Sequence, residues 1–238
     1  MASTEPTPDS PIQRARESSP PHEPDKRKKL RTVKEEHALD FGNVVTVVVG
    51  NDSEGKSKSV IVHEDLLRAS YEFFDKALDG PWKESARRII ELPADDPRIF
   101  AMYVRWLYFG SLAVLKGNVE AEEGENQFTN LVNAYILGDK LLCGDFQNAA
   151  IKEFVKRMKF FDPHNDVVKH IYAHTRPDAS LRRLVVDVFI MNGTKGWLED
   201  WNGDENIPQT FILDIAKAAL SGNNGQSRKR PDPKDYYV

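Results

Sequence analysis

The residues that favour β-strands lie early in the chain, and helical spacing follows them. The first strand-like run is Val44–Val49, and a polar segment containing glycine separates it from a second run, Ser59–Val62. β-Branched residues favour strands, and two such runs joined in this way predict a hairpin. A third short run, Arg88–Leu92, stops at Pro93. A few early strands followed by many helices predict an α+β fold.

Helical patterns begin after His63. The first contains two apolar clusters separated at Ala69-Ser70, which predicts a break there. Asp96 and Pro97 predict the N-cap and first turn of a central helix. Apart from Arg98 and Arg105 this helix is apolar nearly all round, so we expect it to be buried. The segment Lys116–Asn126 is rich in Gly, Glu and Asn and predicts an exposed loop. Three- and four-residue apolar spacing predicts later helices around 128–136, 151–158, 166–175, 180–191 and 209–220.

Composition divides the chain of 238 residues into four parts. Residues 1–36 hold six of the fourteen prolines and few large apolar residues, so they bury too little surface to offset the entropy of ordering. Residues 221–238 have a similar composition with added basic residues. We therefore predict a disordered tail at 1–36, a domain at 41–159, a helical extension at 160–220 and a disordered basic tail at 221–238. The pattern of the domain is strongest at 44–113.

The formal net charge of −4 gives the whole protein no electrostatic reason to bind nucleic acid. Two short basic runs lie outside the predicted core, and they are typical of nuclear-import signals, of phosphate-binding arms or of solvated tails. Their residues are Lys26, Arg27, Lys28 and Lys29 in the first run and Arg228, Lys229 and Arg230 in the second.

A single cysteine, Cys143, excludes an intrachain disulfide and a zinc finger, and fits a reducing compartment. No segment has the apolar length of a membrane span or the pattern of a secretion signal. We therefore expect a nuclear or cytoplasmic protein with no membrane partner.

One segment, Gly50–Ser57, matches the phosphate-binding pattern G-x-x-x-x-G-K-[ST]. Such a loop must open a helix whose N-terminal amides hold the phosphates. Here the loop is followed by Lys58–Val62, which favours a strand, and Asp52 and Glu54 would repel a triphosphate. Nucleotide binding is the weaker alternative, and the segment is better explained as the turn of the hairpin.

Other patterns that suggest chemistry have simpler explanations. Asp166, His170 and His174 follow a four-residue spacing, which suits either a divalent metal or a solvated helix face. Cys143 lies among apolar residues and is better explained as a small core residue than as a nucleophile. We predict no catalytic residue, no cofactor and no metal.

An ordered series of short segments runs through the predicted strands and helices. They are Val45–Gly50, Val62–Leu67, Ser70–Phe74, Ile90–Pro93, Asp96–Phe100, Trp106–Gly110 and Asn133–Leu141. This series resembles the BTB/POZ family, most closely the short BTB proteins of filamentous fungi. The stretch Tyr172–Asp187 resembles the helical C-terminal extension of those fungal proteins.

The resemblance implies a small sheet capped by a cluster of helices and a role in assembling proteins. Members pair through their first strand and first helices, and some link a partner to a cullin-type ubiquitin ligase. By position, the core or dimer contacts would be Val45, Val47, His63, Leu66, Leu67, Phe73 and Phe74. Many relatives carry an acidic residue at Asn43 and a basic one at Glu64, so the charged groove of some relatives is not expected here.

We therefore predict a non-enzymatic interaction module that forms a homodimer and docks other proteins. A substrate adaptor of a cullin-type ligase is the alternative.

Overall fold

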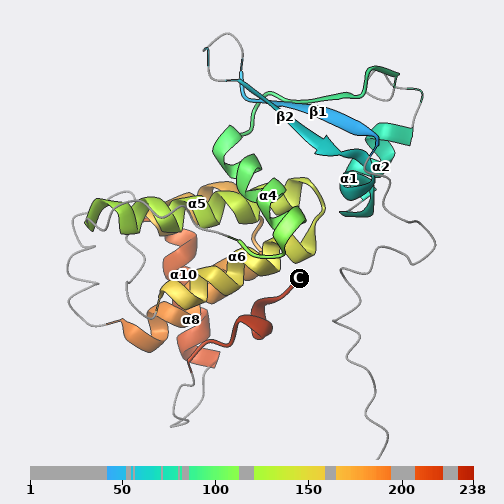
Figure 1. Cartoon of the computed structure of the whole chain (residues 1–238). Coiled ribbons are helices and arrows are strands. Elements are labelled where there is room, and N and C mark those ends of the chain that lie inside the picture. The colour runs from blue at the N-terminus through green and yellow to red at the C-terminus, as the bar shows by residue number, and fades with distance from the viewer. Residues whose placement is uncertain are drawn as a thin grey trace, which may run out of the picture. The chain divides into compact units, whose positions relative to one another are not determined.

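A three-stranded sheet forms one side of the computed structural model, with the strand order β2-β1-β3 (Figure 1). β1 (Val44–Val49) pairs antiparallel with β2 (Lys58–His63) and parallel with β3 (Ile89–Leu92). The predicted hairpin and third strand are therefore confirmed, and so is the α+β class, since eight α-helices accompany the sheet in the described residues. The structure describes residues 42–51, 55, 57–70, 72–79, 81, 86–112, 121–158, 165–193, 207–221 and 230–238, with side chains from 127 onward in the helix that begins at 121.

Two short helices, α1 (Glu64–Ser70) and α2 (Glu72–Asp79), follow the hairpin. They are separated where the sequence predicts a break, and the Ser70 hydroxyl lies 2.9 Å from the Tyr103 hydroxyl. The buried Glu64 carboxylate accepts from Arg68 at 2.8 Å and pairs with Arg88 at 2.9 Å. Glu64 therefore ties the start of α1 to the residue that precedes β3.

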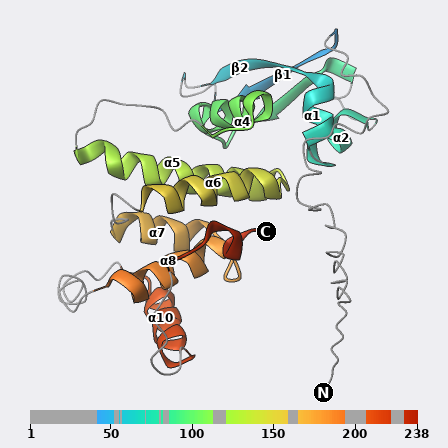
Figure 2. The same ribbon diagram turned by 60° about the horizontal axis from the view of Figure 1, so that its bottom comes forward.

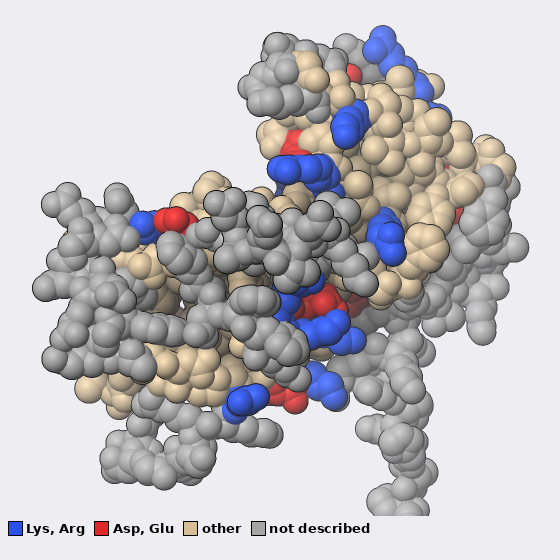
Figure 3. Space-filling model, turned by 60° about the vertical axis from the view of Figure 1, so that its left-hand side comes forward, with Lys and Arg blue, Asp and Glu red and all other residues tan. Residues whose placement is uncertain are grey.

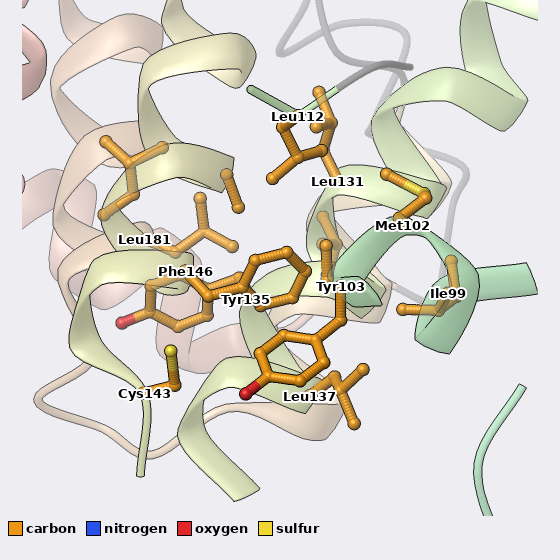
Figure 4. Close-up of a cluster of buried hydrophobic side chains, with 14 of the residues drawn as sticks. Ile99, Met102, Tyr103, Leu112, Leu131, Tyr135, Leu137, Cys143, Phe146 and Leu181 are labelled. Carbon is orange, nitrogen blue, oxygen red and sulfur yellow. The ribbon is translucent and has the colours of Figure 1, made fainter. Parts of the chain in front are cut away.

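The central helix, α4 (Pro97–Phe109), begins and ends as the sequence predicts. The Asp96 carboxylate accepts the Arg98 amide at 2.8 Å, and Gly110 ends the helix with a φ of 69°, a left-handed conformation that glycine adopts without strain. Tyr103 is fully buried, and its ring lies edge-on to that of Phe146, with centroids 5.0 Å apart (Figure 4). The buried Cys143 lies in the same cluster (Figure 4), which agrees with its expected role as a core residue.

The pair α5 (Ala121–Lys140) and α6 (Gly144–Arg157) packs beside α4. Gly138 allows the two helices to approach closely, since a Cβ there would lie 2.7 Å from Gln147 Cγ. The predicted exposed loop at 116–126 is wrong for residues 121–126, which are helical. Ala and Glu have high intrinsic helix propensities, and these outweigh the loop-like composition of the segment.

The last helices are α7 (Asn165–His174), α8 (Ser180–Asn192) and α10 (Gln209–Ser221), close to the predicted bounds. Figure 2 shows α5, α6, α7 and α8 as successive layers. α5 contacts both α4 and α7, within one compact unit that spans Val33–Val238. The predicted domain at 41–159 and the extension at 160–220 therefore pack together.

A buried arginine, Arg182, joins α7 to α8. Its guanidinium donates to the Tyr172 carbonyl at 2.8 Å and to the Thr175 hydroxyl at 3.0 Å, and it also bonds the Thr175 carbonyl. It lies 4.5 Å from the centroid of the Tyr172 ring. The last carbonyls of a helix have no partner within the helix and attract cations, so Arg182 caps the C-terminal end of α7.

The prediction of a disordered tail at 221–238 is wrong for its last residues. A 3₁₀ helix, η3 (Pro233–Tyr236), packs against α6 and α8, and Tyr236 is buried. The Asp232 carboxylate accepts the Lys234 amide at 3.0 Å and so caps this helix. The segment is polar in composition, but one buried tyrosine and a capped turn are enough to order it. The predicted tail at 1–36, with its basic run, and residues 222–229 lie outside the described residues.

Candidate interaction surface

Most residues that the resemblance marks as core or dimer contacts are core residues. Val45, Val47, Leu67 and Phe74 have no exposed surface. Burial of this kind leaves them unable to touch a partner while the domain is folded. Leu66 and Phe73 are partly buried and pack against the same core. A surface for a partner must therefore be found among other residues.

The outer face of the sheet carries exposed apolar side chains. Successive residues of a strand point to opposite faces, and β1 buries Val45, Val47 and Val49. On the other face, Thr46 pairs with Ile61 of β2 and with Ile89 of β3, so the three form one row across the sheet. Ile61 is 67% exposed.

His63 extends this face toward the end of α4. It pairs with Val44 on β1, and its ring Nδ1 lies 2.7 Å from the Tyr108 hydroxyl. Tyr108 and its neighbour Phe109 are both exposed, Phe109 by 70%, and their ring centroids are 6.4 Å apart. His63 thus links the sheet to Tyr108, which the sequence predicts to lie in a buried helix, and through Tyr108 to Phe109. We call Val44, Ile61, Ile89, Tyr108 and Phe109 the sheet-face patch.

The sequence contains a signal that these aromatic residues are exposed, but the many apolar residues of α4 make it hard to see. Ala101, Arg105 and Tyr108 are exposed and share one helix face by their spacing, and Phe109 lies four residues after Arg105. The Arg105 guanidinium lies 5.7 Å from the centroid of the Phe109 ring. The expectation that α4 is buried nearly all round is therefore wrong for this face.

The outer edge of β2 lies next to the patch. The Glu64 amide donates to the Asn43 carbonyl at 3.0 Å. In an antiparallel pair, residues that bond the neighbouring strand alternate with residues whose backbone groups face the other way, so this bond shows which residues of β2 do which. The backbone groups of Ser59, Ile61 and His63 therefore point away from β1. The Tyr108 hydroxyl accepts the His63 amide at 3.3 Å, whereas no other strand of the described residues pairs with Ser59 or Ile61. An open edge of this kind is a template for pairing with another strand.

The segment that matches the phosphate-binding pattern lies at the opposite end of the strands. It connects β1 to the antiparallel strand β2, so no helix begins at its end. A cleft beside it is lined by Lys58, Asp95, Asp96 and Arg98, among others. Asp96 already caps α4 and pairs with Arg98 at 2.8 Å, and hydrogen bonding to Arg98 lowers the pKa of its carboxyl. The acid therefore occupies the helix N-terminus that a phosphate would need.

The histidines of α7 are engaged in packing rather than grouped as metal ligands. His170 Nε2 lies 2.6 Å from the Asn133 side-chain oxygen on α5, and His174 Nδ1 lies 3.0 Å from the His170 carbonyl. Asp166 pairs instead with Lys169 at 3.2 Å. Within the described part of the chain, no group of three or more potential ligands is placed to hold a metal ion.

The position of His170 predicts a pH dependence of stability. Burial, and secondarily the charge of His174, lower the pKa of His170 below its ordinary value of about 6.5. Below that pH the unfolded chain binds more protons at this site than the folded chain, so stability falls as pH decreases from about 6.5 toward the lowered pKa. We expect His170→Asn to flatten this part of a urea-unfolding profile measured against pH. His174→Asn, which removes only the secondary cause, should keep most of the slope, and an unchanged profile for His170→Asn would contradict the prediction.

No matching family was found when the sequence was compared with models of known protein families, and no similar protein was found among curated proteins.

None of the described helices has the length and apolar character to cross a membrane. Basic and acidic side chains are interspersed on the face drawn in Figure 3, and the described residues there form no continuous basic patch. Of the two basic runs, only Arg230 lies in the described residues, where it is exposed.

Proposed function

We propose that the chain is a non-enzymatic protein-interaction module of the BTB/POZ type, which associates with a second copy through the sheet-face patch. The exposure of Ile61 on the outer face of the sheet, and of Phe109 next to the Tyr108 that bonds His63 of β2, carries this proposal. Large apolar residues grouped at the surface are typical of interaction sites, and burying each is worth about 1.5–3 kcal/mol.

Two features of the fold support the BTB/POZ assignment. The element order is a hairpin, two short helices, a third strand and a largely apolar helix, which is the order of the segments that carry the resemblance. The residues of those segments that lie in the core hold the sheet to the helices, as Val47 and Phe74 do. The residues that we place in the surface contact, by contrast, are not those that the resemblance marks as core or dimer contacts, although Tyr108 and Phe109 lie in the segment Trp106–Gly110 that carries it.

A symmetric dimer fits the chemistry of the patch. In an interface with two-fold symmetry the same surface is used by both copies, so the patch must be complementary to itself. Ile61, Ile89 and Phe109 are uncharged and can therefore pack against their own copies. The open edge of β2 offers backbone donors and acceptors next to Ile61. Burying both together removes an exposed strand edge and an exposed apolar face.

Sedimentation velocity on the full chain tests this proposal. The wild type is expected to associate with increasing concentration, and Ile61→Lys or Phe109→Ser to weaken association by at least about tenfold, as central interface residues do. Leu220→Ser on α10, which removes an equally apolar side chain that is 84% exposed, is the matched control and should associate like the wild type. Equal weakening by the control would contradict the assignment of the interface.

A wild-type chain that stays monomeric at tens of micromolar would refute self-association. If such a chain instead co-purified with a cullin, the ligase-adaptor alternative would replace the proposal.

A further inference from the structure

The segment 230–238 packs against α6 and α8, and its helix η3 contacts both of them (Figure 2). Tyr236 inserts its ring there, and its hydroxyl donates to the Asp187 carboxylate on α8 at 2.7 Å. Burial, reinforced by Asp187, raises the pKa of the Tyr236 phenol, which favours the neutral hydroxyl that donates to Asp187. The helices therefore cover the aromatic ring of Tyr236 and accept a hydrogen bond from its hydroxyl.

The side chain of Asn148 on α6 binds the backbone of the segment. The Asn148 side-chain oxygen accepts the Val238 amide at 2.9 Å, and its amide nitrogen donates to the Val238 carbonyl at 3.2 Å. A side-chain amide that satisfies both backbone groups of one residue holds an extended peptide regardless of its side chain. Gly144, at the start of α6, lies beside Val238, since a Cβ at Gly144 would be in ordinary contact with it at 3.5 Å.

Residues within the segment also stabilise its conformation. Pro231 and Pro233 restrict the backbone, and the Asp232 carboxylate caps the short helix that leads to Tyr236. Eight residues, 222–229, connect it to α10, so its binding is intramolecular and benefits from a high effective concentration. These are the properties of a peptide ligand joined to its receptor by a linker.

We propose that the surface of α6 and α8 under this segment is a docking site for a tyrosine-containing peptide, which the chain covers with its own segment 230–238. Asp187 selects a neutral tyrosine hydroxyl, and Asn148 holds the backbone two residues later. The segment limits access, so a peptide from another molecule binds only when the segment leaves. A phosphorylated tyrosine is excluded, because its negative charge would face the Asp187 carboxylate.

Peptide binding to the full chain tests the site. The probe is a fluorescent peptide with the sequence of residues 230–238 and both ends blocked, and the readout is anisotropy. The full-chain variant Tyr236→Ala, whose own segment has lost its anchor, is expected to bind the peptide at least about tenfold more tightly than the wild type does. Adding Asp187→Ala or Asn148→Ala to this variant should reverse the gain. A peptide with Tyr236→Phe should bind about tenfold more weakly, and one with Tyr237→Phe as tightly as the parent.

Equal binding by wild type and Tyr236→Ala, or no binding by a folded Tyr236→Ala chain, would overturn the proposal. If Tyr236→Ala fails to fold, the full-chain variant Tyr236→Phe tests whether the hydroxyl holds the segment in place. This variant keeps the ring and removes only the hydroxyl. We expect amide exchange in residues 234–238 to accelerate about tenfold in that variant. Exchange at the wild-type rate would refute the role of the Asp187 contact.

Discussion

Replacing Phe74 by alanine is expected to lower the free energy of unfolding by about 3–5 kcal/mol. The side chain has no exposed surface, and its ring stacks on that of Tyr103 with centroids 6.0 Å apart. Protein interiors are closely packed, so removing the ring leaves a cavity that the neighbouring helices fill only in part. Urea unfolding followed by circular dichroism measures this loss.

Phe109→Ala is the matched control, because it makes the same chemical change at a site that is 70% exposed. At a concentration where the chain is monomeric, we expect it to change the free energy of unfolding by no more than about 0.5 kcal/mol. The comparison distinguishes two phenylalanines. Phe74 lies in the core, although the family resemblance marks it as a possible dimer contact, and Phe109 lies on the surface, where we place the interface. Similar losses in the two variants would contradict this division.

Replacing Arg182 by alanine is expected to cost about 2–4 kcal/mol, which is unusually large for a charged residue. The guanidinium is buried, and it donates to the carbonyl groups of Tyr172 and Thr175 at the end of α7. Without it these carbonyls are left unsatisfied, and the contact with the Tyr172 ring is lost.

The neighbouring Arg183 provides the control for this change. It is exposed and donates to the Ser180 hydroxyl at 3.0 Å, so Arg183→Ala should cost no more than about 0.5 kcal/mol. Thermal unfolding of the two variants side by side makes the comparison. If Arg182→Ala were as stable as Arg183→Ala, the cap on α7 would not stabilise the fold.

Local sequence signals account for much of the architecture. β-Branched residues and the glycine-containing segment predict the hairpin, since strand propensity and turn chemistry act over a few residues. Asp96 and Pro97 predict the start of α4 for the same reason, because a helix cap is formed by the adjacent side chain. The break at Ser70 is likewise visible in the separation of two apolar clusters.

Features that depend on distant partners were not predictable in this way. Tyr236 is ordered by Asp187, which lies 49 residues away, so composition alone made its segment look disordered. Phe109 has mostly apolar neighbours in the sequence, and the packing of α4 shows that it lies on the outward face that Arg105 marks. The sheet-face patch was missed for the same reason, since it combines three strands with the last turn of a helix.

The central claim is that a second copy binds the sheet-face patch and the open edge of β2. Amide hydrogen exchange at Ser59 and Ile61, measured by NMR on the full chain across a range of concentrations, tests it most directly. Both amides point away from β1, so exchange should slow as the protein associates, and Ile61→Lys should abolish this protection. Exchange at these amides that stays unchanged while the protein associates would show that the interface lies elsewhere.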